Sequence, residues 1–150
     1  RLGRTRVETI ENKKPYCFGK AYSLTEGEDV AIIAAGMMVK EALKAEAVLR
    51  KERIGCRIIN MHTIKPLDTE AVIKAARETK GIVICEEHSV VGGLASAIDE
   101  VLAENCPTRV LRVSIRDRFG QSGQPQELLK EYNLTAEDII RAAKTVLQDI

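Results

Sequence analysis

Polar residues that could do chemistry gather in two short segments of the chain. These residues are His62, Lys65, Glu86, Glu87, His88, Gly92 and Gly93. Histidines and carboxylates can exchange protons with a substrate or ligate a metal ion. A glycine pair ahead of a helix can turn backbone N–H groups toward an anion. The two segments therefore raise acid–base catalysis, metal binding and anion contact as possible functions.

The two segments form a catalytic or metal-binding cluster only if the fold places them side by side. In that case Glu86, Glu87 and His88 would join His62. We favour the simpler interpretation, in which each histidine is hydrogen-bonded and locks a loop or an interface. No serine of the chain stands in the sequence context of an activated nucleophile.

The glycine pair also has a simpler interpretation. Gly92-Gly93 lacks the further glycine spacing of dinucleotide-binding and phosphate-binding loops. A tight turn from a strand into a helix requires glycine whatever it binds. We therefore expect the pair to serve the turn, and anion contact stays as the alternative.

The elements that would position these segments follow from apolar runs and helical periods. Continuous apolar runs at residues 30–35 and 82–85 are typical of strands buried on both faces, and the segment 58–61 is a further expected strand. Apolar residues at helical spacing predict helices at 38–53, 69–80, 94–102 and 139–150, with a short helix starting at Pro125. Asp68 is a candidate N-cap, and Thr135 with Asp138 resembles a capping box. A short strand at 19–24 completes the expected set.

The alternation of strands and helices predicts the fold class. It favours a mostly parallel sheet with helices on both faces, which is a three-layer α/β/α fold. Residues 111–115 alternate apolar and polar side chains, so we expect them at an edge of the sheet with one face solvated. We interpret Arg112, Arg116 and Arg118 as this solvated edge, with contact to an acidic partner as the alternative.

Charged residues within the first long helix allow two further expectations. Glu46 falls inside the apolar stripe, and we expect it at the rim of the stripe rather than in an ion pair. The remaining charged residues are expected on a solvated face. They are Lys40, Glu41, Lys44, Arg50 and Lys51.

Composition excludes several classes of function. The 150 residues carry 23 Lys+Arg against 22 Asp+Glu, and a net charge of +1 leaves no electrostatic footprint for nucleic acid or an anionic membrane. The longest apolar run, residues 30–39, is shorter than the about 20 residues that span a bilayer. The absence of tryptophan argues against a stacking platform for bases or sugars.

The cysteines and the start of the chain set two further expectations. Cys17, Cys56, Cys85 and Cys106 form no C-x-x-C pair, which argues against zinc, and we expect Cys56 and Cys85 as small buried side chains. We infer a reducing compartment and place the protein in the cytoplasm. The chain starts with Arg1 and shows no leader, so we expect it to be part of something longer.

The same segments resemble the C-terminal domain of the transketolase family. The similarity is strongest to the C-terminal section of split bacterial and archaeal transketolases. Its motifs, in chain order, are GKA (19–21), GEDVAIIAAG (27–36), MHTIKPLD (61–68), EEH (86–88), GGL (92–94), DRFGQSG (117–123), LL (128–129) and YNLTAE (132–137). His62 and the segment from 117 onward are the most discriminating parts.

The resemblance implies the fold and the kind of enzyme. The sheet should have four parallel strands and one antiparallel strand. Residues 19–150 would be the C-terminal domain, and residues 1–18 a linker from a preceding pyrimidine-binding domain. Transketolases use thiamine diphosphate and a divalent cation such as Mg²⁺ to move a two-carbon ketol unit between sugar phosphates, as in the pentose phosphate pathway.

The resemblance assigns a structural role to this part of the enzyme. The family's metal motif and its activating glutamate are not found in this sequence, so no catalytic, cofactor or metal residue is carried over. The expected partners are the pyrimidine-binding domain of the same chain and a diphosphate-binding domain or N-terminal subunit, in a homodimer or heterotetramer. Candidate interface or anion contacts are His62, Lys65, Glu87, His88, Gly92 and Gly93.

Other members of the superfamily remain as alternatives. 1-Deoxyxylulose 5-phosphate synthases share the segment IKPLD (64–68) but usually lack a histidine like His62 and carry an amide where His88 stands. Beta subunits of 2-oxo-acid dehydrogenases typically have arginine at the His62 position. These differences favour transketolase, although Glu46 departs from the small apolar residue expected there. A stand-alone small-ligand binding module is the alternative from another class.

Overall fold

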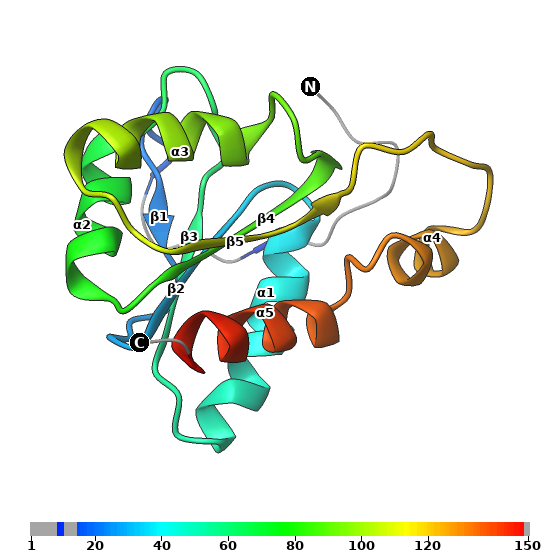
Figure 1. The fold of residues 1–150 in the computed structure, drawn as a ribbon, viewed down its shortest axis with the longest axis horizontal. Helices are drawn as coiled ribbons and strands as arrows, with labels where there is room; N and C mark the ends of the chain where they lie inside the picture. Colours follow the sequence, from blue (N-terminus) through cyan, green and yellow to red (C-terminus); the bar gives the residue numbers. More distant parts are fainter. Residues whose placement is uncertain (1–8, 11–14, 149–150) are drawn as a thin grey trace.

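Five strands form a mixed sheet in the computed structural model, which describes residues 9–10 and 15–148 (Figure 1). The strands are β1 (Tyr22–Ser23), β2 (Val30–Ala34), β3 (Cys56–Asn60), β4 (Ile82–Ser89) and β5 (Val110–Ile115). Their order in the sheet is β1-β3-β2-β4-β5. Strand β1 pairs antiparallel with β3, and the other neighbours are parallel. The expected sheet of four parallel strands and one antiparallel strand is confirmed.

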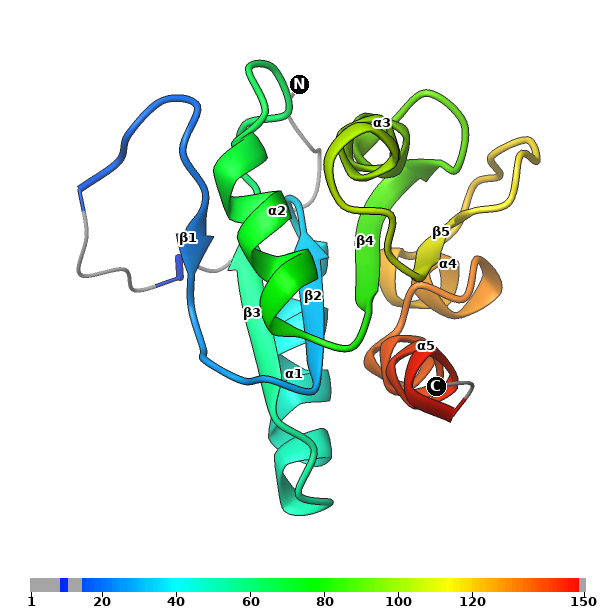
Figure 2. The ribbon, with the colours of Figure 1, turned by 60° about the vertical axis from the view of Figure 1, so that its left-hand side comes forward.

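Helices cover both faces of the sheet (Figure 2). Helices α1 (Met38–Lys51) and α5 (Ala136–Gln148) pack on one face, and α2 (Thr69–Glu78) and α3 (Leu94–Asn105) pack on the other. The short helix α4 (Pro125–Glu131) precedes α5. The three-layer α/β/α fold is therefore confirmed. The expected arm at 1–18 and the end of the last helix at 149–150 lie largely outside the described residues.

The central strand shows why an unbroken apolar run was needed. All five residues of β2 are 0% exposed. Val30, Ile32 and Ala34 face the core under α1 and α5, whereas Ala31 and Ile33 face the core under α2 and α3. Successive side chains of a strand point to opposite faces, so a strand between two helix layers must be apolar at every position.

In the described part of the chain, no helix is both long and apolar enough to cross a membrane.

The predicted N-cap at Asp68 is present, and the predicted capping box at Thr135 and Asp138 is half formed, through the Asp138 carboxylate. The Asp68 carboxylate accepts the N–H of Ala71 at 3.2 Å at the start of α2. It also accepts the N–H of Ala21 at 2.8 Å, which ties the segment before β1 to this helix. Before α5, Asp138 Oδ2 accepts the N–H of Thr135 at 3.0 Å and its hydroxyl at 2.6 Å.

Two glutamates of α1 differ from the expectations. The expectation of a solvated Glu41 is wrong: the residue is 7% exposed, and its Oε2 accepts the N–H of Ala136 at 3.1 Å. Glu41 thereby caps the start of α5. The other four charged residues of that expectation are exposed as expected, and they are Lys40, Lys44, Arg50 and Lys51. Glu46 is not at the rim either, because it is 8% exposed and its Oε1 lies 3.6 Å from Arg50 Nε.

Strand β5 lies at the edge of the sheet, as its alternating pattern predicts. Its arginines are bound within the molecule: Arg112 pairs with Asp99 of α3, and Arg116 Nη2 donates to the Arg112 carbonyl at 3.1 Å. The expected solvated face holds for Arg116 but not for Ser114, which is 4% exposed. The Arg116 contact caps a carbonyl and thereby shields part of the free edge from pairing with another strand.

The amino ends of the parallel strands are joined by a tight polar network. Asp29, before β2, accepts the N–H of Gly55 at 2.8 Å and the Lys80 ammonium at 2.8 Å. The ammonium and the N–H together hold the pKa of the Asp29 carboxyl below its usual value. A Cβ on Gly27 would lie 2.5 Å from the Cys56 nitrogen, so two backbone segments touch here. We call this end of the sheet closed, because its polar groups and its backbone segments contact one another.

Candidate functional site

The candidate residues lie at the carboxyl ends of β3 and β4, either at the end of β4, as Glu87 and His88 do, or in the loops that follow these two strands. In Figure 2 these loops rise beyond the same end of the sheet, together with the segment that leads into β1. Ligands of parallel α/β sheets bind at this end. The side chains there therefore decide what the domain can do.

His62 follows β3 and is held by its neighbours. Its Nδ1 lies 2.8 Å from the Thr63 hydroxyl, and its ring contacts those of Tyr16 and Tyr22, with both centroids 4.9 Å away. Its Nε2 is buried without a hydrogen-bond partner in the described part of the chain. Lys65, three residues on, is exposed. His62 thus fastens the segment before β1 onto the β3 loop, as the interpretation of a loop-locking histidine expects.

Glu86 fills the N-terminus of α3 from the inside. The residue is 2% exposed, and its carboxylate accepts the N–H groups of Leu94 at 2.8 Å and Ala95 at 3.0 Å. A Cβ on Gly93 would lie 2.6 Å from Glu86 Oε1, so glycine is required for the carboxylate to approach. A carboxylate at this position satisfies two orphan donors and complements the helix dipole. Within the motif EEH…GG, Glu86 and Gly93 therefore stabilise the start of α3.

The remaining candidates lie next to Glu86 and Gly93 in the chain. Glu87 is exposed, and His88 is half-buried with its Nδ1 2.9 Å from the Ser89 carbonyl. Gly92 adopts φ +75° and donates its N–H to Ser96 Oγ at 2.9 Å. Anion contact at Gly92-Gly93 stays a prediction, but the N–H groups of Gly92, Leu94 and Ala95 already have acceptors within the domain.

The structure does not bring the two histidine segments together. Strand β2 lies between β3 and β4, so the loops that carry His62 and His88 are not neighbours in the sheet. Glu86, which an acid–base cluster would have used, is committed to α3. Within residues 9–10 and 15–148, no group of three or more His, Cys, Asp or Glu side chains is arranged to hold a metal ion. These described residues therefore do not fit a Mg²⁺ site.

The thiols do not supply a nucleophile in the core. Burial raises the pKa of Cys56 to about 12 and raises that of Cys85 above its ordinary value. Both residues are at most 2% exposed, as expected for small buried side chains. All four cysteines are free thiols.

In the loop after β5, Arg118 was expected at a solvated edge, whereas Phe119 and Tyr132 had no expected role. The Tyr132 hydroxyl donates to the Phe119 carbonyl at 2.9 Å, and the Arg118 guanidinium lies 4.4 Å from the centre of the Tyr132 ring. Arg118 Nη2 also donates to the Glu131 carbonyl at 2.7 Å and carboxylate at 2.8 Å. The Phe119 side chain remains 99% exposed. The motif DRFGQSG (117–123) includes Arg118 and Phe119, but only the contacts in the structure show that these two residues order the loop.

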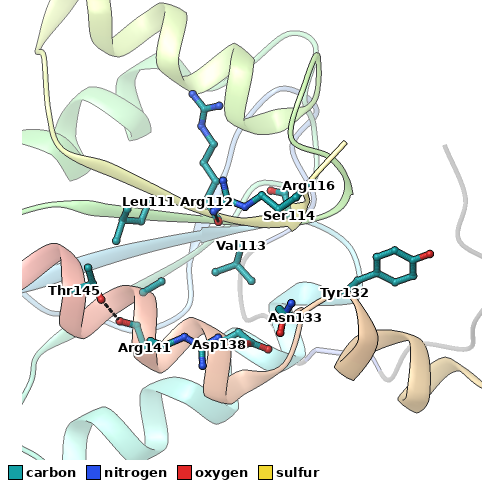
Figure 3. A pocket seen from close by; sticks show the side chains of 11 residues that line it. Leu111, Arg112, Val113, Ser114, Arg116, Tyr132, Asn133, Asp138, Arg141 and Thr145 are labelled. Carbon is teal, nitrogen blue, oxygen red and sulfur yellow. Dashed lines mark hydrogen bonds and ion pairs between the residues drawn. The ribbon is translucent and has the colours of Figure 1, made fainter. Parts of the chain in front are cut away.

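A groove of about 390 Å³ lies between β5 and α5 (Figure 3). In Figure 3 Val113 points from β5 toward α5, whereas Arg112 points to the opposite face. Arg141 in its wall pairs with Asp138, and the Arg141 carbonyl accepts the Thr145 hydroxyl at 2.9 Å. None of the six candidate residues lines this groove. Of its charged groups, Arg141 pairs with Asp138, and Arg112 pairs with Asp99 outside the groove.

Comparison with known proteins places this domain among transketolases. The family model described as "Transketolase, C-terminal domain" matches residues 19–139. A 6-deoxy-6-sulfo-D-fructose transketolase subunit of Clostridium sp. (strain MSTE9) is 44% identical over 147 residues, which make up 98% of this chain and 46% of the relative. A putative transketolase C-terminal section of Methanocaldococcus jannaschii is 42% identical over 154 residues, 100% of this chain and 47% of the relative.

A synthase and a solved structure complete the comparison. The 1-deoxy-D-xylulose-5-phosphate synthase of Heliobacterium modesticaldum is also 42% identical, but over 127 residues, 84% of this chain and 20% of the relative. A solved structure described as "Split gene transketolase, inactive beta4 tetramer" has a TM-score of 0.88 at 42% identity, and the match covers 94% of this chain and 46% of that one.

The chain thus spans less than half the length of these relatives. The family match covers most of the chain. Both the sequence identity and the fold similarity to the solved structure support the same family. The chain therefore belongs to the transketolase C-terminal domain family.

Proposed function

We propose that this chain is the C-terminal domain of a thiamine-diphosphate-dependent transketolase, which transfers a two-carbon ketol unit between sugar phosphates. The observation that carries the proposal is the pattern of coverage. Transketolase subunits match nearly all of this chain with only 46% to 47% of their own length. When bound elsewhere in the enzyme, thiamine diphosphate and Mg²⁺ supply the chemistry that makes and breaks the carbon–carbon bond.

The role of this domain in that enzyme is assembly. Its carboxylates are used inside the fold, as Glu41 and Glu86 are at the starts of two helices. The partners are the pyrimidine-binding domain of the same chain and a diphosphate-binding domain or N-terminal subunit, in a homodimer or heterotetramer. Free thiols at all four cysteines support a reducing setting, and we place the enzyme in the cytoplasm. His62, Lys65, Glu87 and His88 are proposed as contacts with the catalytic domains.

Reconstitution of the whole enzyme tests this proposal. The full-length protein that contains this chain is produced with the subunit or domain that completes it, and ketol transfer is measured with thiamine diphosphate and Mg²⁺. We expect transfer between sugar phosphates only when both parts are present. Formation of 1-deoxyxylulose 5-phosphate instead would assign the chain to the synthases. Micromolar binding of thiamine diphosphate by the domain itself, measured by calorimetry, would contradict an assembly role.

His88 offers a more local test in the same enzyme. If His88 contacts the catalytic domains, His88→Ala alters assembly or turnover of the complete enzyme. Lys74→Ala, at an exposed position of α2, serves as the control. An enzyme that is indifferent to both substitutions would remove His88 from the proposed contacts.

A further inference from the structure

The segment ahead of β1 is fastened to the domain although the family match begins only at Gly19. Residues 15–18 lie outside that match, and they were expected to belong to a linker. In Figure 2 the segment 15–21 lies outside β1, which is an edge strand of the sheet. We call residues 15–21 the clasp, because side chains of β1 and of the loop after β3 hold them in place.

The Tyr22 hydroxyl closes the clasp on itself. It donates to the Pro15 carbonyl at 2.7 Å and accepts the N–H of Cys17 at 2.6 Å. The Lys20 N–H donates to the Cys17 carbonyl at 3.2 Å, which completes a turn. One hydroxyl acts as donor and acceptor at once, a combination that the ring of phenylalanine lacks. Tyr22 therefore holds two backbone groups that lie five and seven residues ahead of it.

A second set of contacts joins the clasp to the loop after β3. The Ala21 N–H donates to Asp68 Oδ2 at 2.8 Å, and Asp68 is buried at the start of α2. Gly19 adopts φ +77°, and a Cβ there would lie 3.0 Å from Pro66 Cγ, so the backbone rests on the proline ring. The motif GKA thus meets the motif MHTIKPLD, and these two parts of the family resemblance serve one contact.

His62 lies where the clasp and β1 meet. Its ring contacts that of Tyr16, in the clasp, and that of Tyr22, in β1. Its Nδ1 lies beside the Thr63 hydroxyl, and its Nε2 is buried with no hydrogen-bond partner among the described residues. His62 therefore contacts the clasp through its ring and not through a hydrogen bond.

Strand β1 is too short to hold this segment by itself. It pairs with β3 through two residues, Tyr22 with Asn60 and Ser23 with Ile59. A strand of this length at the edge of a sheet frays readily, since few backbone bonds hold it. Earlier in the chain, Ile10 is partly buried against the core cluster under α1 and α5. Side-chain contacts, rather than the strand ladder, therefore attach the chain ahead of β1.

An attached segment of this kind changes how two domains on one chain can move. Domains joined by a free linker reorient relative to each other, and this motion is the default for a small interface. Each residue that is fixed in place shortens the free linker and removes orientations of the neighbouring domain. We propose that the clasp makes the segment ahead of β1 a rigid connector, which holds the preceding pyrimidine-binding domain in one orientation relative to this domain; this inference rests on the proposed function.

The rigid connector favours assembly of the enzyme. A subunit whose two domains are already oriented loses less conformational freedom when it binds its partner, so it binds that partner more tightly. Tyr22 and His62 are positioning residues in this role, because they act on the segment that carries the other domain and not on a substrate.

Amide hydrogen exchange in the full-length subunit tests the clasp. We expect the amides of Cys17 and Ala21 to be protected in the wild type, since each donates to a side chain of the domain. Tyr22→Phe keeps the ring beside His62 and removes the hydroxyl, so exchange at Cys17 should accelerate about tenfold. Tyr132→Phe removes a hydroxyl contact from the loop after β5 and is the matched control, with unchanged exchange in the clasp. Exchange in β2 shows for each variant that the domain stays folded.

A distance distribution between the two domains tests the rigid connector. One spin label is attached to Lys74→Cys, at an exposed position of α2, and another to a cysteine introduced on the preceding domain, while Cys17→Ser removes the exposed native thiol. Pulsed electron paramagnetic resonance is recorded on the full-length subunit without its partner, diluted with unlabelled subunit so that distances within one chain are measured. We expect a single narrow distribution, which broadens about twofold when Tyr22→Phe is combined with His62→Ala. Tyr132→Phe should leave the width unchanged.

The outcomes separate the rigid connector from the proposed function. Rapid exchange at Cys17 and Ala21 in the wild type overturns the clasp and the connector with it. A broad distribution in the wild type, or a narrow one that survives the combined substitutions, overturns the connector, because the orientation is then free or is set by other contacts. A narrow distribution that broadens as expected, in a subunit that transfers no ketol unit with its partner, supports the connector and overturns the proposed activity. A full-length protein with no folded domain ahead of this segment overturns both.

Discussion

The two ends of the parallel sheet are built in opposite ways. At the amino ends, Asp29 binds both Gly55 and Lys80, and Gly27 lets two backbone segments touch. At the carboxyl ends, polar groups also bind within the fold, as Glu86 does at α3, but large apolar side chains such as Phe119 are left in solvent. One end is closed, and the other is ordered and open.

This difference separates what stabilises the domain from what it offers to other molecules. The residue types that suggested chemistry, above all Glu86 and the glycine pair, hold the backbone of the open end in place. The surface that remains available there combines large apolar side chains such as Phe119 with exposed charged residues such as Lys65 and Glu87. An ordered apolar face is suited to docking, whereas catalysis would require free polar groups directed at a common point.

The largest effect on stability is expected where the open end is held from inside. Glu86→Ala leaves the buried N–H groups of Leu94 and Ala95 without an acceptor, so the free energy of unfolding should fall by about 3 to 4 kcal/mol. Glu87→Ala, at the exposed neighbouring position, should change it by about 0.5 kcal/mol or less. Urea unfolding measures both. Equal effects at the two positions would show that Glu86 does not hold α3.

The next largest effect on stability is expected from a glycine-to-alanine substitution, compared between the amino end and the carboxyl end of the sheet. Gly27→Ala places a Cβ 2.5 Å from the Cys56 nitrogen, and the backbone must shift, which should destabilise the domain by about 2 to 3 kcal/mol. Gly120→Ala, in the loop after β5, meets no atom within 4 Å and should be nearly neutral. Thermal unfolding of the two variants provides the measurement. A neutral Gly27→Ala would mean that the closed end is more adaptable than its contacts indicate.

Most of the elements could be predicted because their signals are local. Apolar runs marked β2, β3 and β4, helical periods marked the four long helices, and Thr135 with Asp138 marked the start of α5. Strand β4 runs four residues beyond the predicted 82–85, to Ser89. Its polar end remains a strand because the Glu86 carboxylate is satisfied by α3 and because Ser89 pairs with Ile115 of β5.

The candidate site could be predicted only in part because its contacts are remote in sequence. Whether His62 and His88 meet depends on the strand order, and no local pattern shows that β2 lies between their strands. Glu41 caps a helix that starts 95 residues later, and its sequence surroundings are those of a solvated helix face. Phe119 has an ordinary loop sequence, and only its exposure together with the Tyr132 contact shows it to be presented.

A smaller effect is expected from loosening the open end without changing its surface. Tyr132→Phe removes the hydrogen bond to the Phe119 carbonyl and keeps the ring beneath Arg118, so the free energy of unfolding should fall by about 1 kcal/mol. Amide hydrogen exchange at residues 117–123 should accelerate more than exchange in β2. Tyr16→Phe, on a ring that is 69% exposed, is the control and should leave exchange at 117–123 unchanged. Unaltered exchange in Tyr132→Phe would show that the loop is ordered by other contacts.

The smallest effect concerns the closed end and depends on pH. The Lys80 ammonium and the Gly55 N–H lower the pKa of Asp29 in the folded state, so the folded protein binds fewer protons at this carboxyl than the unfolded chain does. The stability that Asp29 contributes is therefore fully present above the pKa of the unfolded carboxyl, near 3.9, and is lost as the pH falls through the lower folded value. Because the Asp29 side chain is about one-third exposed, the contribution should be no more than about 1 kcal/mol. Asp29→Asn should lower the free energy of unfolding at pH 7 and reduce its further loss between pH 5 and pH 3, as measured by urea unfolding at each pH.

Asp117→Asn, at an exposed position of the open end, should leave that acid dependence as it is in the wild type. An Asp29→Asn variant with the full acid dependence of the wild type would show that this network does not contribute to closing the amino end of the sheet.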